Sequence, residues 1–408
     1  MSVTIEQQPQ DYNPVSSPLI YIGLSNQVAQ PNFKYTVIVT DVISSETQTY
    51  PIDPDPDNYC RFDAKPFMEP YISRLHTIPQ NEYGWKVHDG IRQVKVNIGE
   101  TYGSSPAYAS GTDLTHICWN AILSYLDYPI FNYTDFVSEA GTTPVIKILN
   151  DTTFNDVTFE DKSYMLYWLC KGTSSGMSAN IITYDVLGNV VSTSQIDYSA
   201  FASTNYRDKY ICIDVGHKGL SQIDPSDVTG DYPIITDEVA YYEVSVGMIG
   251  SFASSNLAYK TLTIKCEPRF EPYVLHYLKK NGAFQTISFG KKSEVEISKT
   301  SEKYSRSPWV MNSGDYTYDP STPIERVINS ESRRRIKLNT DWLTEEAIES
   351  HKDIIDSPIV YLDRGSELSY VALNVVTNSY QINRRYNSRM LSLEMEFEYA
   401  HTDGRQMT

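Results

Sequence analysis

The feature that most constrains the fold is the alternation of apolar and polar residues in several short segments. In segment 391–399, apolar side chains occupy the odd positions and Ser392, Glu394, Glu396 and Glu398 the even ones. A period of two gives a strand one buried and one wet face. Shorter segments alternate in the same way: 33–40, 94–98 and 261–266. The sequence therefore predicts a mainly β chain.

Turn and helix signals divide these strands. Clusters of Gly, Pro, Asn and Asp predict turns at 51–58, 103–106, 172–176, 187–189 and 312–315. The clearest helix is predicted at 344–356, where Thr344 is positioned to cap the first turn and Ser357-Pro358 to end the helix. Weaker helices are expected at 66–73 and 115–126.

We expect two β-sandwich or β-barrel domains with a few short helices. The proline-bearing segment 1–20 is expected to form an extended N-terminal arm. An N-terminal β-rich domain would span 21–237 and end in a linker-like stretch rich in Asp, Pro, Gly and Thr. The C-terminal domain would span 238–408 and carry the helix 344–356, with a long polar loop at 305–329.

Composition excludes several classes of protein. The chain has 34 Lys and Arg against 51 Asp and Glu, a net charge of −17, which disfavours a general nucleic-acid binder. The apolar runs are far shorter than the roughly 20 residues that span a bilayer, so no membrane insertion is expected. The 32 tyrosines favour strands and interfaces. The first 11 residues lack a signal-peptide pattern, so we expect synthesis and folding in a reducing cytoplasm.

Four motifs that would indicate chemistry are incomplete or absent in the sequence. Segment 53–58 begins like a calcium loop but lacks the glycine and glutamate that such a loop needs. Segment 290–293 lacks the first glycine of a phosphate-binding loop. The Cys and His residues have no zinc spacing, and no Gly-x-Ser-x-Gly elbow occurs. We therefore expect no cofactor, no metal and no enzymatic activity.

Arg333, Arg334 and Arg335 form the only basic triplet. Three roles are open for this triplet. It could form a salt-bridge cluster, either solvated or at an interface. It could also contact a nucleic-acid backbone passing through an assembly, or pair with carboxylates across subunits.

Two segments resemble virion proteins of tailed phages that infect Bacteroidetes, including the crAss-like group. The segment 266–289 begins with Cys266 and contains Tyr-Leu-Lys-Lys-Asn-Gly-Ala-Phe-Gln, similar to a Leu-Asn-x-x-Gly-x-Phe-Asp element, with Lys279 and Gln285 near the expected Asn and Asp. The segment Asp341-Trp-Leu-Thr-Glu-Glu346, followed by Ser-Pro-Ile-Val-Tyr361, resembles a second element. Segments 30–35 and 96–102 also look similar.

The resemblance implies a structural tail subunit of hub, distal-tail or tube-adaptor type, located in the virion after synthesis in the host cytoplasm. Its C-terminal domain would be similar to a tail-tube fold with one flanking helix. The partners would be further copies in a symmetric ring, other tail proteins and DNA in transient passage without sequence recognition. The interface candidates are Arg333, Arg334, Arg335, Trp342, Tyr361 and Tyr399. For Trp342, a core position is expected more than an interface.

Two alternatives remain open at this stage. The first is a receptor- or carbohydrate-binding module at the tail tip, for which exposed aromatic side chains beside Asp and Asn would suit sugar rings. The second is a hydrolase of envelope polymers, which would need a cleft with two carboxylates or a Cys–His pair.

Overall fold

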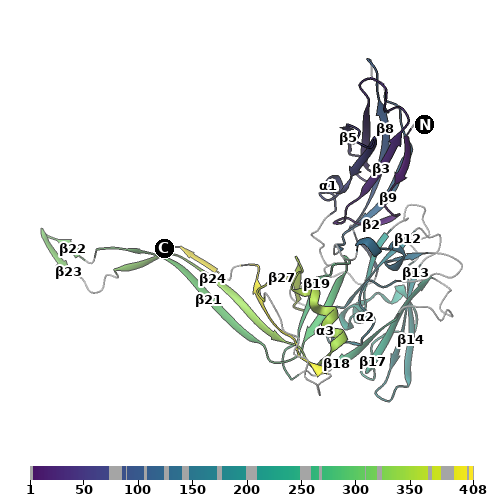
Figure 1. Cartoon of the computed structure of the whole chain (residues 1–408). Coiled ribbons are helices and arrows are strands. Elements are labelled where there is room, and N and C mark those ends of the chain that lie inside the picture. Colours follow the sequence, from purple (N-terminus) through teal and green to yellow (C-terminus); the bar gives the residue numbers. More distant parts are fainter. Residues whose placement is uncertain are drawn as a thin grey trace. The chain divides into compact units, whose positions relative to one another are not determined.

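The computed structural model contains mainly strands, joined by a few short helices (Figure 1). It describes the chain except for residues 1–2, 73–84, 89, 105–107, 124–127, 140–146, 172–176, 199–208, 249–258, 266–268, 308, 319–323, 366–369, 378–389, 402–403 and 408. The described residues form two compact units. Unit 1 contains residues 1–266 and 277–286, and unit 2 contains residues 267–276 and 287–408.

The first half of unit 1 is a β-sandwich. Its larger sheet has the order β2 (Tyr12–Pro14), β9 (Asp113–Trp119), β8 (Ile91–Thr101), β4 (Lys34–Asp41), β5 (Thr47–Ile52). Its smaller sheet has the order β1 (Val3–Gln7), β3 (Ile20–Ser25), β6 (Tyr59–Asp63). Tyr21 of β3 and Val37 and Val96 of the larger sheet are fully buried in one core. The short helix α1 (Lys65–Met68) adds Phe67 and Met68 to that core.

The second half of unit 1 repeats this two-sheet arrangement. One sheet has the order β10 (Val137–Glu139), β12 (Met165–Lys171), β15 (Lys209–Asp214), β7 (Trp85–His88). The other has the order β11 (Asp156–Phe159), β18 (Tyr259–Lys265), β17 (Tyr241–Met248), β13 (Met177–Tyr184), β14 (Val190–Tyr198), β16 (Val228–Gly230). Trp168 of β12 and Tyr242 of β17 are buried in its core, to which α2 (His217–Gln222) adds Leu220. The described part of unit 1 also contains the 3-10 turns η1 (Tyr128–Ile130), η2 (Tyr133–Asp135) and η4 (Pro225–Asp227).

Unit 2 is built on one large sheet. Its order is β20 (Phe284–Phe289), β19 (Tyr273–Leu278), β26 (Val360–Asp363), β27 (Tyr370–Val375), β29 (Glu394–Tyr399), β24 (Glu325–Asn339), β21 (Glu294–Ser305), and β30 (Gly404–Met407) also pairs with β24. Two small pairs accompany it: β22 (Trp309–Asn312) with β23 (Asp315–Tyr318), and β25 (Leu343–Thr344) with β28 (Met390–Leu391). The outer part of the β19–β20 hairpin, residues 277–286, belongs to unit 1.

The helix α3 (Glu345–His351) forms where the sequence predicts it, and η5 (Lys352–Ile354) continues it. The Thr344 hydroxyl accepts a hydrogen bond from the Ala347 amide at 3.3 Å, and Glu345 and Glu346 lie in the first turn. The side-chain cap and the acidic residues of the first turn both stabilise the start of the helix. The helix is shorter than the predicted span 344–356.

The structure confirms the predicted fold class of a mainly β chain with sandwich domains and few short helices. It differs from the predicted boundaries. Segment 1–20 is not an extended arm, because β1 pairs with β3 and β2 pairs with β9. The boundary at 237 divides one sheet, since β13 before it pairs with β17 after it. The predicted helix at 115–126 is wrong, because residues 113–119 form β9.

Asn150 joins two strands, β12 and β20, inside unit 1. Its side-chain amide donates to the carbonyls of Met165 at 3.0 Å and Phe284 at 2.8 Å, and its oxygen accepts from the Tyr167 amide at 2.7 Å. All four groups lie in the interior, where each lost hydrogen bond leaves a costly desolvated group.

We therefore expect Asn150→Ala to lower the free energy of unfolding by about 3 kcal/mol. Urea unfolding followed by tryptophan fluorescence measures the change. The control is Asn189→Ala in the exposed β13–β14 turn, where Asn189 donates to Asp185. Asn189→Ala should lower the free energy of unfolding by no more than about 0.5 kcal/mol. Equal losses in the two variants would contradict the role of Asn150.

Candidate interaction surface

Strands β21 and β24 form a long two-stranded ribbon, which we call the arm. They pair in antiparallel register from Glu294 opposite Lys337 to Ser305 opposite Glu325. Strand β29 covers β24 only along residues 335–339, and β30 only along 329–332. Figure 1 shows the arm running on beyond the strands that flank its base. Where neither β29 nor β30 flanks β24, the arm has two strands only, and an isolated two-stranded ribbon is only marginally stable in water.

The pair β22–β23 lies at the far end of the arm, and we call it the tip (Figure 1). Its turn has positive φ at Ser313 (53°) and Gly314 (100°), as a two-residue hairpin of the primed type requires. Trp309, Met311 and Tyr316 share one face of the tip, because Met311 pairs with Tyr316 and Trp309 lies two residues before Met311. Their exposed fractions are 56%, 64% and 69%. Side chains of these types are enriched at protein interfaces.

The base of the arm has an apolar face. Ile336 of β24 is buried and pairs with Phe397 of β29, as the alternation predicts. On the other side, Val295 of β21 pairs with Ile336, and Ile297 pairs with Arg334. Val295 and Ile297 are more than half exposed, so this apolar face continues past the core to the edge of the sheet.

The opposite face carries charges. Arg333 donates from Nη1 to Glu398 Oε1 at 3.0 Å, and Arg335 donates from Nε to Glu398 Oε2 at 2.8 Å. Hydrogen bonds from Arg335 and Arg333 lower the pKa of the Glu398 carboxyl. Glu398 is only 8% exposed, although the alternation places it on the wet face. The two guanidinium groups cover it and keep it charged.

The structure separates the predicted interface residues into two groups. Arg333 and Arg335 pair with a carboxylate of their own chain, and Arg334 lies on the apolar face, 5.7 Å above the Tyr399 ring. Tyr399 is half-buried, and burial raises the pKa of its hydroxyl.

Trp342 and Tyr361 form the second group, and their rings contact residues other than these arginines. Trp342 is 60% exposed, so the expectation of a core position is wrong. Its ring is covered by Lys291, whose Nζ lies 3.9 Å from the ring centroid. Tyr361 is half-buried, and its ring centroid lies 6.4 Å from that of Tyr370.

The acidic segment 53–58 forms a turn held by its own chain. The Asp55 carboxylate accepts from the amides of Asp57 and Tyr59, and Arg61 pairs with Asp55 at 2.8 Å. Within the described residues, no three His, Cys, Asp or Glu side chains gather as metal ligands would. No described helix has both the length and the apolar composition of a membrane span.

Comparison with known proteins adds little. No family model matches the sequence, and no curated protein matches it. Among solved structures, chicken CNTN1 FN1-FN3 domains align at 10% identity over 64% of this chain and 66% of that chain. The TM-score is 0.16.

Sequence reasoning missed the arm and the tip. It placed a long polar loop at 305–329, where the structure has the outer arm and the tip. The signal was present, since Trp309 and Met311 alternate before the turn at 312–315, and Tyr316 and Tyr318 alternate after it.

The pairing of Glu398 with two arginines predicts a pH dependence. A carboxyl whose pKa is lowered by folding stabilises the native state above its unfolded pKa, and this is lost as the pH falls through its folded pKa. Glu398→Gln should therefore lower the urea midpoint of unit 2 at neutral pH, and the difference from the unchanged protein should shrink in acid.

Glu394→Gln is the matched control, because Glu394 pairs with one exposed lysine, Lys337. Its effect on the midpoint should be smaller. A Glu398→Gln difference that is independent of pH would contradict the ion-pair explanation.

Proposed function

We propose that the chain is a structural subunit of a bacteriophage tail, of hub, distal-tail or tube-adaptor type, which assembles into a symmetric ring through the arm and the tip. The observation that carries the proposal is the arm. It exposes Val295 and Ile297 on its edge strand and three large apolar side chains at the tip. The resemblance of segments 266–289 and 341–361 to phage virion proteins supports the same assignment.

The edge of the sheet at β21 supports pairing with another strand. Among the described strands, β21 has β24 as its only neighbour. Every second backbone N–H and C=O of β21 therefore faces away from β24, as on any edge strand, which is a template for strand addition. Contacts of this kind use backbone groups for affinity and side chains for register.

The charges of the arm are balanced within the chain. Strands β21 and β24 contain seven Lys and Arg and five Glu, and β29 places Glu394, Glu396 and Glu398 beside β24. The arm therefore offers a partner its apolar side chains and its backbone edge, and a second copy of the chain presents an edge of the same kind.

An arm that docks on a different surface of the next copy makes a heterologous contact. Contacts of this type propagate head to tail, and they form a ring when the rotation between copies closes. The arm would then be covered in the assembly, which would stabilise its outer part. In a tail ring, an acidic wall would also repel the phosphates of DNA in passage.

Exposed aromatic side chains also favour a second candidate function, a carbohydrate-binding module. Trp309 and Tyr316 at the tip offer apolar ring faces to sugars. This function requires binding of host glycans by the single chain, and the glycan affinity should fall when Trp309 is replaced by Ser.

The ring proposal is tested by the molar mass of the purified protein in solution. We expect light scattering after size-exclusion chromatography to give one closed oligomer, and electron microscopy to show rings with a central channel. The triple variant Trp309→Ser, Met311→Ser and Tyr316→Ser should remain folded and weaken self-association by about tenfold or more, because its apolar contacts are lost.

The matched control replaces Val186 and Leu187 by Ser. These two apolar residues lie in the β13–β14 turn, and both are 86% exposed. This control should assemble like the unchanged protein. Rings that persist in the tip variant, or an unchanged protein that stays monomeric at high concentration, would contradict the proposal.

The charge of the ring gives a separate expectation. Assembled rings should not retain duplex DNA in a filter-binding assay at low ionic strength, because the acidic surface repels phosphates. The positive control is an unrelated protein with a net positive charge, which should retain the duplex under the same conditions. Salt-sensitive DNA binding by the unchanged ring would contradict a channel that lets DNA pass.

A further inference from the structure

Lys260 of β18 is a fully buried lysine in unit 1. Its Nζ lies 2.6 Å from the Asp151 carbonyl oxygen, 2.9 Å from the Phe154 carbonyl oxygen and 2.9 Å from Asp156 Oδ2. The Phe154 ring lies against it, with 4.3 Å between Nζ and the ring centroid. Three oxygens and one aromatic face therefore fix the position of this nitrogen.

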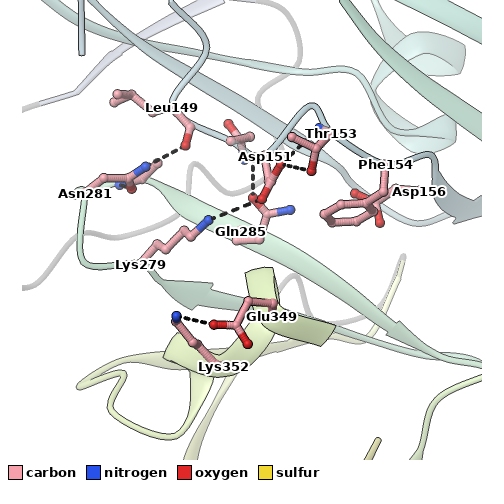
Figure 2. Close-up of polar contacts among 12 residues, drawn as sticks. Leu149, Asp151, Thr153, Phe154, Asp156, Lys279, Asn281, Gln285, Glu349 and Lys352 are labelled. Carbon is pink, nitrogen blue, oxygen red and sulfur yellow. Dashed lines mark hydrogen bonds and ion pairs between the residues drawn. The ribbon is translucent and has the colours of Figure 1, made fainter. Parts of the chain in front are cut away.

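The backbone holds the two charged partners side by side. Asp156 begins β11, which pairs in parallel with β18, and Asp156 lies opposite Leu262. Lys260 lies two residues before Leu262 and points to the same face of the sheet. Figure 2 shows the segment before β11, where Asp151 is hydrogen-bonded to Thr153 and Gln285 and lies 4.0 Å from Lys279 Nζ. The acidic partner and both carbonyls thus belong to one fixed segment.

Burial makes the charged form of this pair costly. An ammonium and a carboxylate lose their hydration in the interior, and their mutual attraction offsets this loss only where further hydrogen bonds satisfy both groups. Transfer of one proton from Lys260 to Asp156 gives a neutral amine and a neutral acid. The amine then keeps two N–H groups for the carbonyls of Asp151 and Phe154, and its lone pair faces the Asp156 carboxyl group.

Tyr164 supplies a hydrogen-bond donor to the same carboxyl group. Its hydroxyl donates to Asp156 Oδ2 at 2.5 Å, and Gln285 Nε2 donates to the Tyr164 oxygen at 3.4 Å. Burial raises the pKa of Tyr164 well above its ordinary value, so the hydroxyl keeps its proton. A donor fixed at this place stabilises negative charge that develops on the oxygen when the carbon is attacked.

We propose that Lys260 and Asp156 form an intramolecular isopeptide bond. The Nζ lone pair adds to the Asp156 carboxyl carbon and gives a tetrahedral centre, with Tyr164 hydrogen-bonded to one of its two oxygens. The other oxygen leaves as water and takes the two protons that the lysine nitrogen loses. The nitrogen keeps its third proton as the amide N–H, which donates to a neighbouring carbonyl. No oxidant or cofactor is needed.

Two further features favour this condensation. Well-oriented intramolecular reactions reach effective molarities of about 10⁵ M or more, which lowers the barrier to this condensation. Asp156 keeps 13% of its side-chain surface exposed, which gives the released water a route out. The bond would join the edge strand β11 covalently to β18, and this inference does not depend on the proposed assembly.

The test is the intact mass of the unchanged chain under denaturing conditions. The expected mass is lower than the sequence mass by one water molecule. Tryptic peptides should contain a branched species that joins the segment with Asp156 to the segment with Lys260, with no cleavage after Lys260. A full sequence mass with a free Lys260 peptide, after prolonged incubation of the folded protein, would overturn the proposal.

Two variants connect the mass loss to this site. Asp156→Ala should restore the full mass, less the difference between the two side chains, and Tyr164→Phe should slow the loss of water at least tenfold. The matched control is Asp113→Ala, which breaks the exposed pair of Asp113 with Lys95 and should still lose water. If Asp156→Ala does not fold, the branched peptide of the unchanged chain decides the question.

Discussion

Every strand must find hydrogen-bond partners for the N–H and C=O groups on both of its sides, and this requirement shapes the whole chain. In unit 1 the described strands form two pairs of sheets around apolar cores, in which the inner strands are paired on both sides and the short edge strands on one. In unit 2 one large sheet ends at β20 and at β21, and the longer of these two edges is the 12-residue β21, whose outer side has no neighbour among the described strands. The proposed assembly follows from this one edge, because a second chain is the means by which its backbone groups would be satisfied.

Side-chain alternation decides what that edge offers. One face of the arm carries Val295 and Ile297, and the other carries Glu294 and Glu296 opposite Lys337 and Arg335. The apolar face supplies the contact area, and the charged face fixes the register of β24 against its neighbours through Glu398. The arginine triplet therefore acts first inside the chain, and Arg334 alone of the three lies on the apolar face that we propose to be covered.

The strands and the capped helix could be predicted from the sequence, because alternation and capping are local. Segment 391–399 was predicted as one strand, and the structure divides it into β28 and β29. The division arises because Thr340 and Leu393 exchange backbone and hydroxyl hydrogen bonds, a contact between residues 53 positions apart. Such pairings have no local signal, and the pairing of β13 with β17 across the predicted boundary is of the same kind. The contact of Trp342 with Lys291 likewise has no local signal, since the two residues are 51 positions apart in the sequence.

Hydrogen–deuterium exchange of β21 tests the central claim most directly. The account predicts that the amides of residues 294–305 that face away from β24 exchange quickly in the dissociated chain and become protected when copies assemble. The exposed β13–β14 turn at Val186 and Leu187 should exchange equally in both states. Assembly that leaves β21 exchange unchanged, while protecting other edge strands, would contradict the account.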